Sequence, residues 1–176
     1  MELQDTSQRI TYYLDEGDYT HEGKKLSQLG EVEVGSFENQ CSKNNFVELS
    51  SRRDGAMKKA ETAAIGIISG AIEGNIPKES TQFEDLTSLR RAGITLLGSV
   101  KVFNAPLADD AGAISPNDPL IIDPDSGKLT TTDETDTGCV AEESKLANEG
   151  GFINIVVEGN KILVAESETE TPGGSG

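Results

Sequence analysis

Residues 55–69, GAMKKAETAAIGIIS, align without gaps with residues 127–141, GKLTTTDETDTGCVA, and this pair of segments decides the predicted fold. Taken alone, the first segment is typical of a helix, because its apolar side chains recur near a 3.6-residue spacing and alanine and lysine favour helices. Its partner is rich in threonine and acidic residues, which favour strand and turn. Two copies of one fold share their secondary structure. We therefore predict a strand from residue 55 to about 60, a turn and a second strand over residues 64–69, with a helix as the alternative.

Two further pairs of segments occur in the same order in both halves of the chain. Residues 26–34, LSQLGEVEV, match residues 94–102, ITLLGSVKV, and both alternate as strands do. Residues 45–55, NFVELSSRRDG, and residues 118–128, DPLIIDPDSGK, are each typical of a β-hairpin with a polar turn that ends in glycine. We predict a tandem duplication and a mainly β fold of two small lobes, each a β-barrel or β-tulip-like domain.

The predicted domain organisation follows from these repeats. In chain order it comprises an extended N-terminal arm (1–22), a first β repeat (23–84), a linker with a short helix (85–93), a second β repeat (94–165) and a flexible acidic, glycine-rich tail (166–176). The linking helix is expected in FEDLTSLRRA, capped by Ser80 or Thr81 and ended by Gly93. Gly159 and Asn160 are predicted to join the last two apolar strands in a hairpin.

Composition excludes several classes of function. The chain has 176 residues and a net charge of −16, which repels the phosphate backbone of nucleic acids. It contains no apolar run of about 18 residues and no segment typical of a secretory leader, so neither membrane insertion nor secretion is expected. We expect no nucleic-acid and no membrane partner.

Candidate catalytic and metal-binding residues are few. Cys41 and Cys139 are too isolated for a zinc site or a disulfide framework, and His21 is the only histidine. Asp123 could begin a calcium loop that ends at Glu134, but the glycine of that loop comes one residue early, which favours an ordinary hairpin turn. No motif of nucleophilic catalysis occurs. We predict a protein that is not an enzyme and that has no metal and no cofactor.

The N-terminal arm carries the predicted partner-binding residues. Residues 9–19, RITYYLDEGDY, are apolar enough to pair as a strand yet precede both repeats. We predict that this strand adds to an open sheet edge of a partner, where Ile10, Tyr12 and Leu14 fill pockets. A disordered leader is the alternative.

The second repeat resembles the small decoration or cement proteins of tailed-virus heads. Its segments DPLIID, TGCVA and GGFINIVVEG are similar to that family's GDLVVVD, IGVA and GExVxVxxxG patterns, over about 60 residues. The resemblance implies a compact β-barrel or β-tulip domain without catalysis that binds the major capsid protein on the outer surface of the virion, after synthesis in the host cytoplasm. It also implies self-association, with trimers at three-fold positions as one form. A carbohydrate-binding or adhesion β module is the alternative, although such modules use exposed aromatic side chains and this chain has three Tyr and five Phe.

Overall fold

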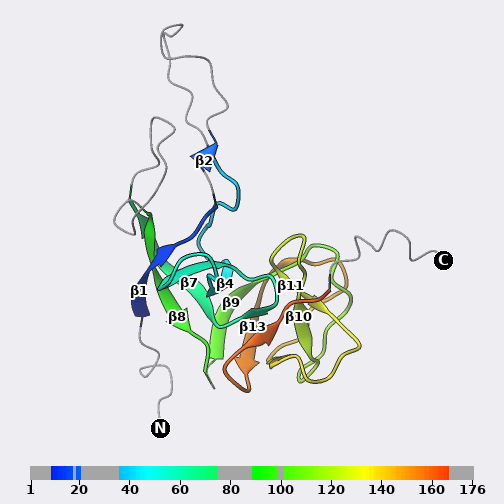
Figure 1. Cartoon of the computed structure of the whole chain (residues 1–176). Coiled ribbons are helices and arrows are strands. Elements are labelled where there is room, and N and C mark those ends of the chain that lie inside the picture. Colours follow the sequence, from blue (N-terminus) through cyan, green and yellow to red (C-terminus); the bar gives the residue numbers. More distant parts are fainter. Residues whose placement is uncertain (1–8, 18, 21–35, 75–88, 99–100, 167–176) are drawn as a thin grey trace, which may run out of the picture.

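The computed structural model describes residues 9–17, 19–20, 36–74, 89–98 and 101–166 (Figure 1). Within these ranges the chain forms fourteen strands and no helix. The predicted mainly β class is confirmed. The strands form two units, which we call the barrel (the described residues of 9–98) and the second unit (residues 101–166).

Five strands close the barrel in the order β1, β5, β4, β7, β8 and back to β1. They are β1 (Arg9–Leu14), β4 (Phe46–Leu49), β5 (Ala56–Lys59), β7 (Gly66–Glu73) and β8 (Arg91–Leu96). Neighbours are antiparallel except β1 and β5, which are parallel. Because alternate residues of a strand face the same side, each strand places one fully buried side chain in the barrel core. These are Leu14, Val47, Met57, Ile68 and Ile94.

The second unit is a five-stranded sheet in the order β10, β11, β9, β13, β12. Its strands are β9 (Lys101–Leu107), β10 (Leu120–Ile122), β11 (Leu129–Thr131), β12 (Cys139–Ala141) and β13 (Gly151–Val157). The edge strands β10 and β12 meet at one bridge between Pro119 and Val140, and the Ala141 N–H donates to the Asp118 carbonyl at 2.9 Å. This bridge joins the two ends of the sheet, so its strands also follow a ring.

The two rings have the same strand order. Around the rings, β1, β5, β4, β7 and β8 correspond to β9, β11, β10, β12 and β13, and β9 pairs with β11 in parallel as β1 does with β5. One main-chain hydrogen bond recurs at the same place: the Asp15 N–H donates to the Met57 carbonyl at 2.7 Å, and the Ala108 N–H donates to the Leu129 carbonyl at 2.8 Å. A duplication as the origin of this correspondence stays a prediction.

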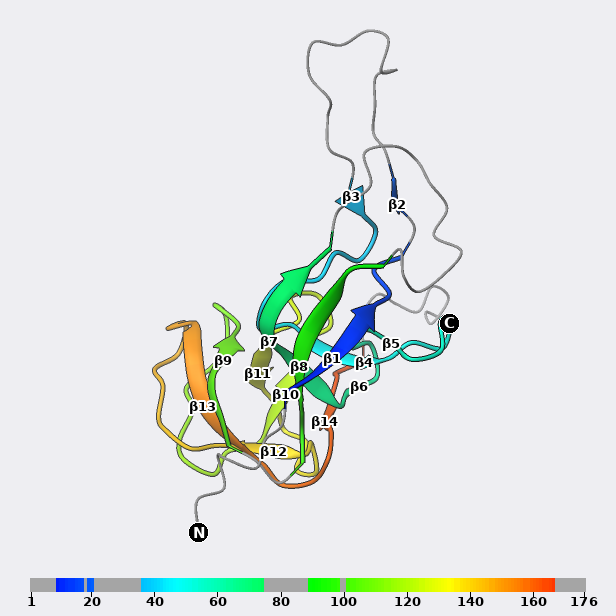
Figure 2. The same ribbon diagram turned by 90° about the vertical axis from the view of Figure 1, so that its left-hand side faces the viewer.

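Two short strand pairs complete the fold. Strand β14 (Ile162–Leu163) follows the second unit in the chain but pairs with β6 (Ala63–Ala64), between β5 and β7 of the barrel (Figure 2). Strands β2 (Tyr19–Thr20) and β3 (Ser36–Phe37) pair with each other. The larger core cluster also spans both units, because Phe46 and Ile67 of the barrel pack with the buried side chains of the second unit. The two units therefore share the larger cluster, while the barrel also has a separate cluster of its own.

The hairpins and strands around residues 45–73 and 118–141 agree with the sequence analysis. Residues 56–59 and 66–73 are strands β5 and β7, so the predicted strand–turn–strand is confirmed and the helical alternative is wrong. Both predicted hairpins form, as β4–β5 and β10–β11. The turns that join them place Gly55 and Gly127 at φ values of 78° and 71°, which glycine adopts without strain.

Other expectations differ from the structure. Residues 9–14 are barrel strand β1 rather than an arm outside the lobes, because β1 pairs with both β5 and β8 and so closes the barrel. Residues 91–96 are strand β8 of the barrel, so the second unit begins after them, and the predicted helix does not extend over residues 89–92. The rest of that helix, from residue 83 to 88, and the repeat segment 26–34 lie outside the described residues.

The predicted terminal hairpin is also corrected. Residues 151–157 and 162–163 are strands, as expected, but β14 pairs with β6 and not with β13. The reason is burial: Ile162 is fully buried in the shared core when β14 lies against the barrel.

Candidate functional site

The largest concentration of buried polar groups in the described residues lies where β1 ends. Glu16 is 2 % exposed and accepts two hydrogen bonds from Arg90, from Nε at 2.8 Å and from Nη2 at 2.7 Å. The same carboxylate accepts the Cys41 N–H at 2.7 Å. Paired with Glu16 in this way, the Arg90 guanidinium has a pKa above its usual value, mainly because of the hydrogen bond to the carboxylate. One side chain thus ties together the end of β1, the segment before β4 and the segment before β8.

Aromatic and main-chain contacts extend this tie. The Arg90 guanidinium lies 5.9 Å from the centroid of the Phe37 ring, a cation–π distance, and Arg90 Nη2 lies 3.4 Å from the Cys41 carbonyl. Gly74, at the end of β7, packs against Arg90, because a Cβ atom at Gly74 would lie 3.1 Å from the Arg90 Cα. The Glu16–Arg90 pair therefore fixes the point where β7 ends and β8 begins.

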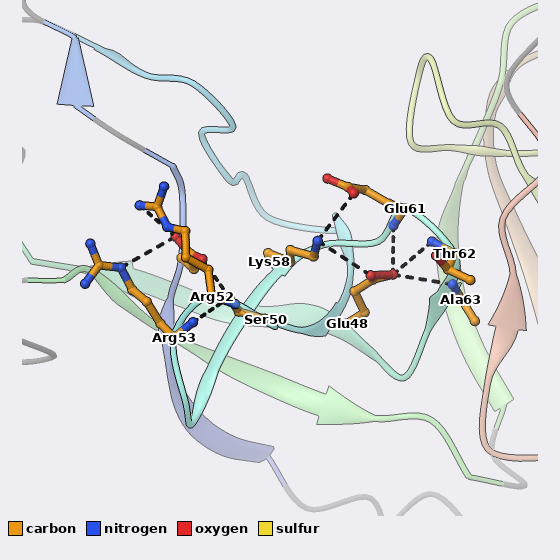
Figure 3. A network of polar contacts seen from close by, with 9 residues as sticks. Glu48, Ser50, Arg52, Arg53, Lys58, Glu61, Thr62 and Ala63 are labelled. Carbon is orange, nitrogen blue, oxygen red and sulfur yellow. Dashed lines mark hydrogen bonds and ion pairs between the residues drawn. The ribbon is translucent and has the colours of Figure 1, made fainter. Parts of the chain in front are cut away.

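Asp15 anchors the turn of the β4–β5 hairpin beside this pair. Its carboxylate accepts the Ser50 hydroxyl at 2.6 Å and lies 3.5 Å from Arg52 and 3.8 Å from Arg53. The Ser50 oxygen in turn accepts the N–H groups of Arg52 and Arg53, both at 3.1 Å, which shapes the turn (Figure 3). A cavity of about 250 Å³ opens here, lined by Asp15, Ser50, Arg52 and neighbouring charged residues.

A second carboxylate organises the loop that carries β6. Glu48 accepts the N–H groups of Glu61 and Thr62, both at 2.9 Å, and lies 3.4 Å from the Ala63 nitrogen (Figure 3). Lys58 lies 4.0 Å from the Glu48 carboxylate and 3.3 Å from that of Glu61. Because Ala63 belongs to β6, this network shapes the barrel loop with which β14 pairs.

These polar groups hold loops of the barrel in place. The carboxylates of Asp15, Glu16 and Glu48 each accept hydrogen bonds from the chain, and these bonds fix the loops around them. Burial raises the pKa of both cysteine thiols to about 12, so neither thiol ionises near neutral pH. His21 lies outside the described residues. Within the described residues no group of three or more His, Cys, Asp or Glu side chains is placed to hold a metal ion.

The turn at Asp123 has the geometry of a hairpin turn. Its carboxylate accepts the Asp125 N–H at 3.2 Å and the Ser126 hydroxyl at 2.9 Å. Such a carboxylate bond to the chain two residues on is the contact of an Asx-turn. The residue is thus used to close the β10–β11 hairpin.

The predicted partner-binding residues do not act as one surface. Leu14 is fully buried in the barrel core, and Tyr12 packs against the same cluster. Leu14 therefore fills the core of the chain's own barrel and not a pocket of a partner, because β1 is the strand that closes the barrel. Ile10 is 40 % exposed and Tyr12 is half-buried, and a partner contact at either side chain stays a prediction.

The sequence analysis missed Asp15, Glu16, Arg90 and Glu48. The available signal was local: two acidic residues directly follow an apolar strand, and two arginines directly precede another. Charged residues at strand ends are common at exposed sites, so this pattern alone did not indicate burial. Burial here follows from the register of β1 between β5 and β8.

Comparisons with known proteins identify no relative: no family model, no curated protein and no solved structure matches this chain. The described residues contain no helix that is long and apolar enough to cross a membrane. The functional argument therefore starts from the residues of this chain.

Proposed function

We propose that the chain is a non-enzymatic structural protein that binds the outer surface of a viral capsid lattice and stabilises it. One observation carries the proposal: the segments that resemble the decoration proteins of tailed-virus heads coincide with strands of one folded unit. DPLIID contains β10, TGCVA contains β12, and GGFINIVVEG contains β13. The resemblance thus extends over a set of neighbouring strands, and not over scattered sequence.

The polar groups of the barrel agree with a binding role. Asp15, Glu16 and Glu48 hold loops through bonds within the chain, which favours a rigid surface over a reactive centre. A rigid surface loses little conformational freedom when it docks, and that lowers the cost of association.

Co-sedimentation tests the proposal. Full-length protein is mixed with empty heads of the virus whose genome encodes the chain, and bound protein is counted per head by quantitative gel densitometry. We expect saturable binding and a higher temperature of head disruption for the decorated heads. An absence of saturable binding, or specific retention on a glycan array in its place, contradicts the proposal and favours a carbohydrate-binding module.

A further inference from the structure

The outer face of the sheet in the second unit has apolar side chains that reach solvent. Strand β13 alternates, and its three core residues are buried: Ile153, Ile155 and Val157. The residues between them therefore lie on the outer face. Phe152 is 50 % exposed there, and Val156 is half-buried. Val140 of β12 lies opposite Val156 in the ladder and is also half-buried, so it belongs to the same face.

We call this surface, with Phe152, Val156 and Val140 as its apolar residues, the β13 face. In the ladder of β13 with β9, Pro106 lies opposite Phe152 and Lys101 lies opposite Val156. Figure 2 shows β13 and β9 on the side of the molecule away from β1 and the other barrel strands. Grouped exposed apolar side chains mark interaction sites, whereas single ones need no explanation.

Two glutamates follow the strands of this face. Glu142 comes directly after β12, and its N–H donates to the Asn154 carbonyl at 2.9 Å. Glu158 comes directly after β13, and its N–H donates to the Gly138 carbonyl at 2.8 Å, so the ladder of β12 and β13 continues to this residue. Because side chains alternate along a strand, both carboxylates lie on the β13 face.

Both carboxylates can take a cationic partner from outside. Glu142 pairs with Lys101 at 2.6 Å, but the Lys101 side chain is half exposed and that of Glu142 one-third exposed, and such a surface pair contributes little to stability. Glu158 is exposed, and no ion pair of Glu158 occurs among the described residues. The β13 face thus has an apolar centre with available carboxylates beside it.

The charge of the whole second unit has the same sign. Residues 101–166, all of which the structure describes, carry thirteen Asp and Glu against four Lys and no Arg, a net charge of −9. Residues 1–98 of the full sequence have a net charge of −5, so the negative charge is most concentrated in the second unit. A basic partner is therefore attracted to this unit, and an acidic one is repelled by it.

We propose that the β13 face binds a basic segment of the partner protein, whose apolar side chain packs on Phe152 while its Lys or Arg groups donate to Glu142 and Glu158. The proposal rests on the proposed function only in taking that partner to be the capsid protein. Aromatic side chains supply much of the binding energy at protein interfaces. Charge-assisted hydrogen bonds beside such a residue add orientation and reject partners of the wrong charge.

The β13 face is tested first with soluble peptides. The ¹⁵N-labelled full chain is titrated with the peptide KLKLKLK at about 50 mM NaCl, where screening is weak. The peptide KSKSKSK has the same charge without the apolar side chains, and ELELELE has the opposite charge. We expect KLKLKLK to shift the amides of Val140, Phe152 and Val156 saturably, KSKSKSK to bind more weakly, and ELELELE to leave these amides unmoved.

Two variants of the face are compared with two matched controls. Phe152→Ser should weaken the binding of KLKLKLK by about tenfold, and Glu158→Lys by about fivefold. Leu146→Ser changes another exposed apolar residue of the second unit, and Asp133→Lys changes an exposed acidic residue of the loop after β11. Each control should weaken the binding by less than about twofold. Dispersed amide spectra of each variant show that it is folded.

The same four variants are then compared in the head co-sedimentation. If KLKLKLK leaves the amides of the β13 face unmoved, if ELELELE shifts them equally, or if Phe152→Ser and Glu158→Lys bind the peptide as their controls do, the proposal is wrong. If the peptide binds the face but unmodified protein does not bind heads, the capsid role fails and the binding face stands. If heads bind all four variants equally, the β13 face is not the capsid contact.

Discussion

The barrel and the second unit follow the same ring of strands but are held together differently. The barrel encloses a small apolar cluster and adds a polar tie at its end, where Asp15 and Glu16 are buried with arginine partners. At the place of Asp15 the second unit has the buried residue Ala108, and its core is a large apolar cluster that extends into the barrel. One topology is thus stabilised by ion pairs in one unit and by apolar packing in the other.

The two units therefore contribute to the fold in different ways. Buried ion pairs contribute specificity of geometry more than stability, because desolvation offsets much of their attraction. The barrel has two long connections, between β2 and β3 and between β7 and β8, and its polar tie lies at the bases of both. The second unit has shorter connections and a larger core, which is shared with the barrel through Ile162 and its neighbours.

The largest expected effect is at Gly138, the residue that the repeat aligns with Gly66. Gly138 has a φ of 99°, and a Cβ atom there would overlap the Lys161 carbonyl and approach the Ile162 Cα to 3.3 Å. Main-chain atoms cannot move aside, so Gly138→Ala should lower the free energy of unfolding by about 4 kcal/mol or more. Urea denaturation followed by circular dichroism measures it.

Gly66→Ala is the matched comparison. A Cβ atom there meets a methyl group of Ile94 at 2.6 Å, and this side chain can shift, so we expect a loss of about 1 to 3 kcal/mol. Gly159→Ala, where the added atom meets nothing within 4 Å, is the control with little change. Equal losses for Gly138→Ala and Gly159→Ala would contradict the packing of β14 against the second unit.

The polar tie of the barrel is tested by Arg90→Met. This change leaves the buried Glu16 carboxylate without its guanidinium partner, and we expect a loss of about 3 kcal/mol in the free energy of unfolding. The double variant Glu16→Gln/Arg90→Met removes both charges and should recover part of that loss. If Arg90→Met alone is as stable as the unmodified chain, the tie does not stabilise the barrel.

Both units bury a cysteine, and alkaline pH should destabilise both. The pKa of Cys41 and of Cys139 is raised from 9.0 to about 12 in the fold, mainly by burial. Because the unfolded chain releases these protons from about pH 9 and the folded chain only near pH 12, stability is complete below pH 9 and falls as pH rises between the two values. At pH 10 each thiol should cost about 1.4 kcal/mol.

Cys41→Ala and Cys139→Ala isolate this dependence. Each variant loses packing at every pH. Between pH 8 and pH 10, however, its free energy of unfolding should fall by about 1.4 kcal/mol less than that of the unmodified chain, because one buried thiol is missing. A reagent that labels thiolates should modify the native protein slowly at pH 8 and the urea-unfolded protein quickly. Rapid labelling of the native protein would show that the thiols are not buried.

Much of the fold could be predicted from residues that act locally. Turn glycines such as Gly55 and Gly127 and the apolar runs before them indicate hairpins, because turn geometry depends on a few neighbouring residues. Strand partners at long range could not be predicted in this way. Whether β1 closes its own barrel or extends to a partner depends on which edge is free, and the apolar alternation of Ile10, Tyr12 and Leu14 is the same in both cases.

The buried polar groups of the candidate site could not be predicted from the sequence for the same reason. Glu16 and Arg90 are 74 positions apart, and their pairing follows only from the register of β1 against β8. The register shift of β7 against β8 between Ile68 and Ile72 is a bulge, which no periodicity in the sequence marks. Long-range register therefore decides both features.

The smallest expected effect tests the correspondence of the two units directly. Gly55 and Gly127 occupy the same place in the β4–β5 and β10–β11 hairpins, with similar positive φ values, and a Cβ atom at either position meets nothing within 4 Å. Only backbone strain should therefore act in Gly55→Ala and Gly127→Ala, at about 1 kcal/mol each. Asparagine tolerates positive φ better than alanine, so Gly55→Asn and Gly127→Asn should each recover about half of that loss. Urea denaturation of the four variants measures both steps, and a loss in one unit several times that in the other would show that the hairpins are not equivalent.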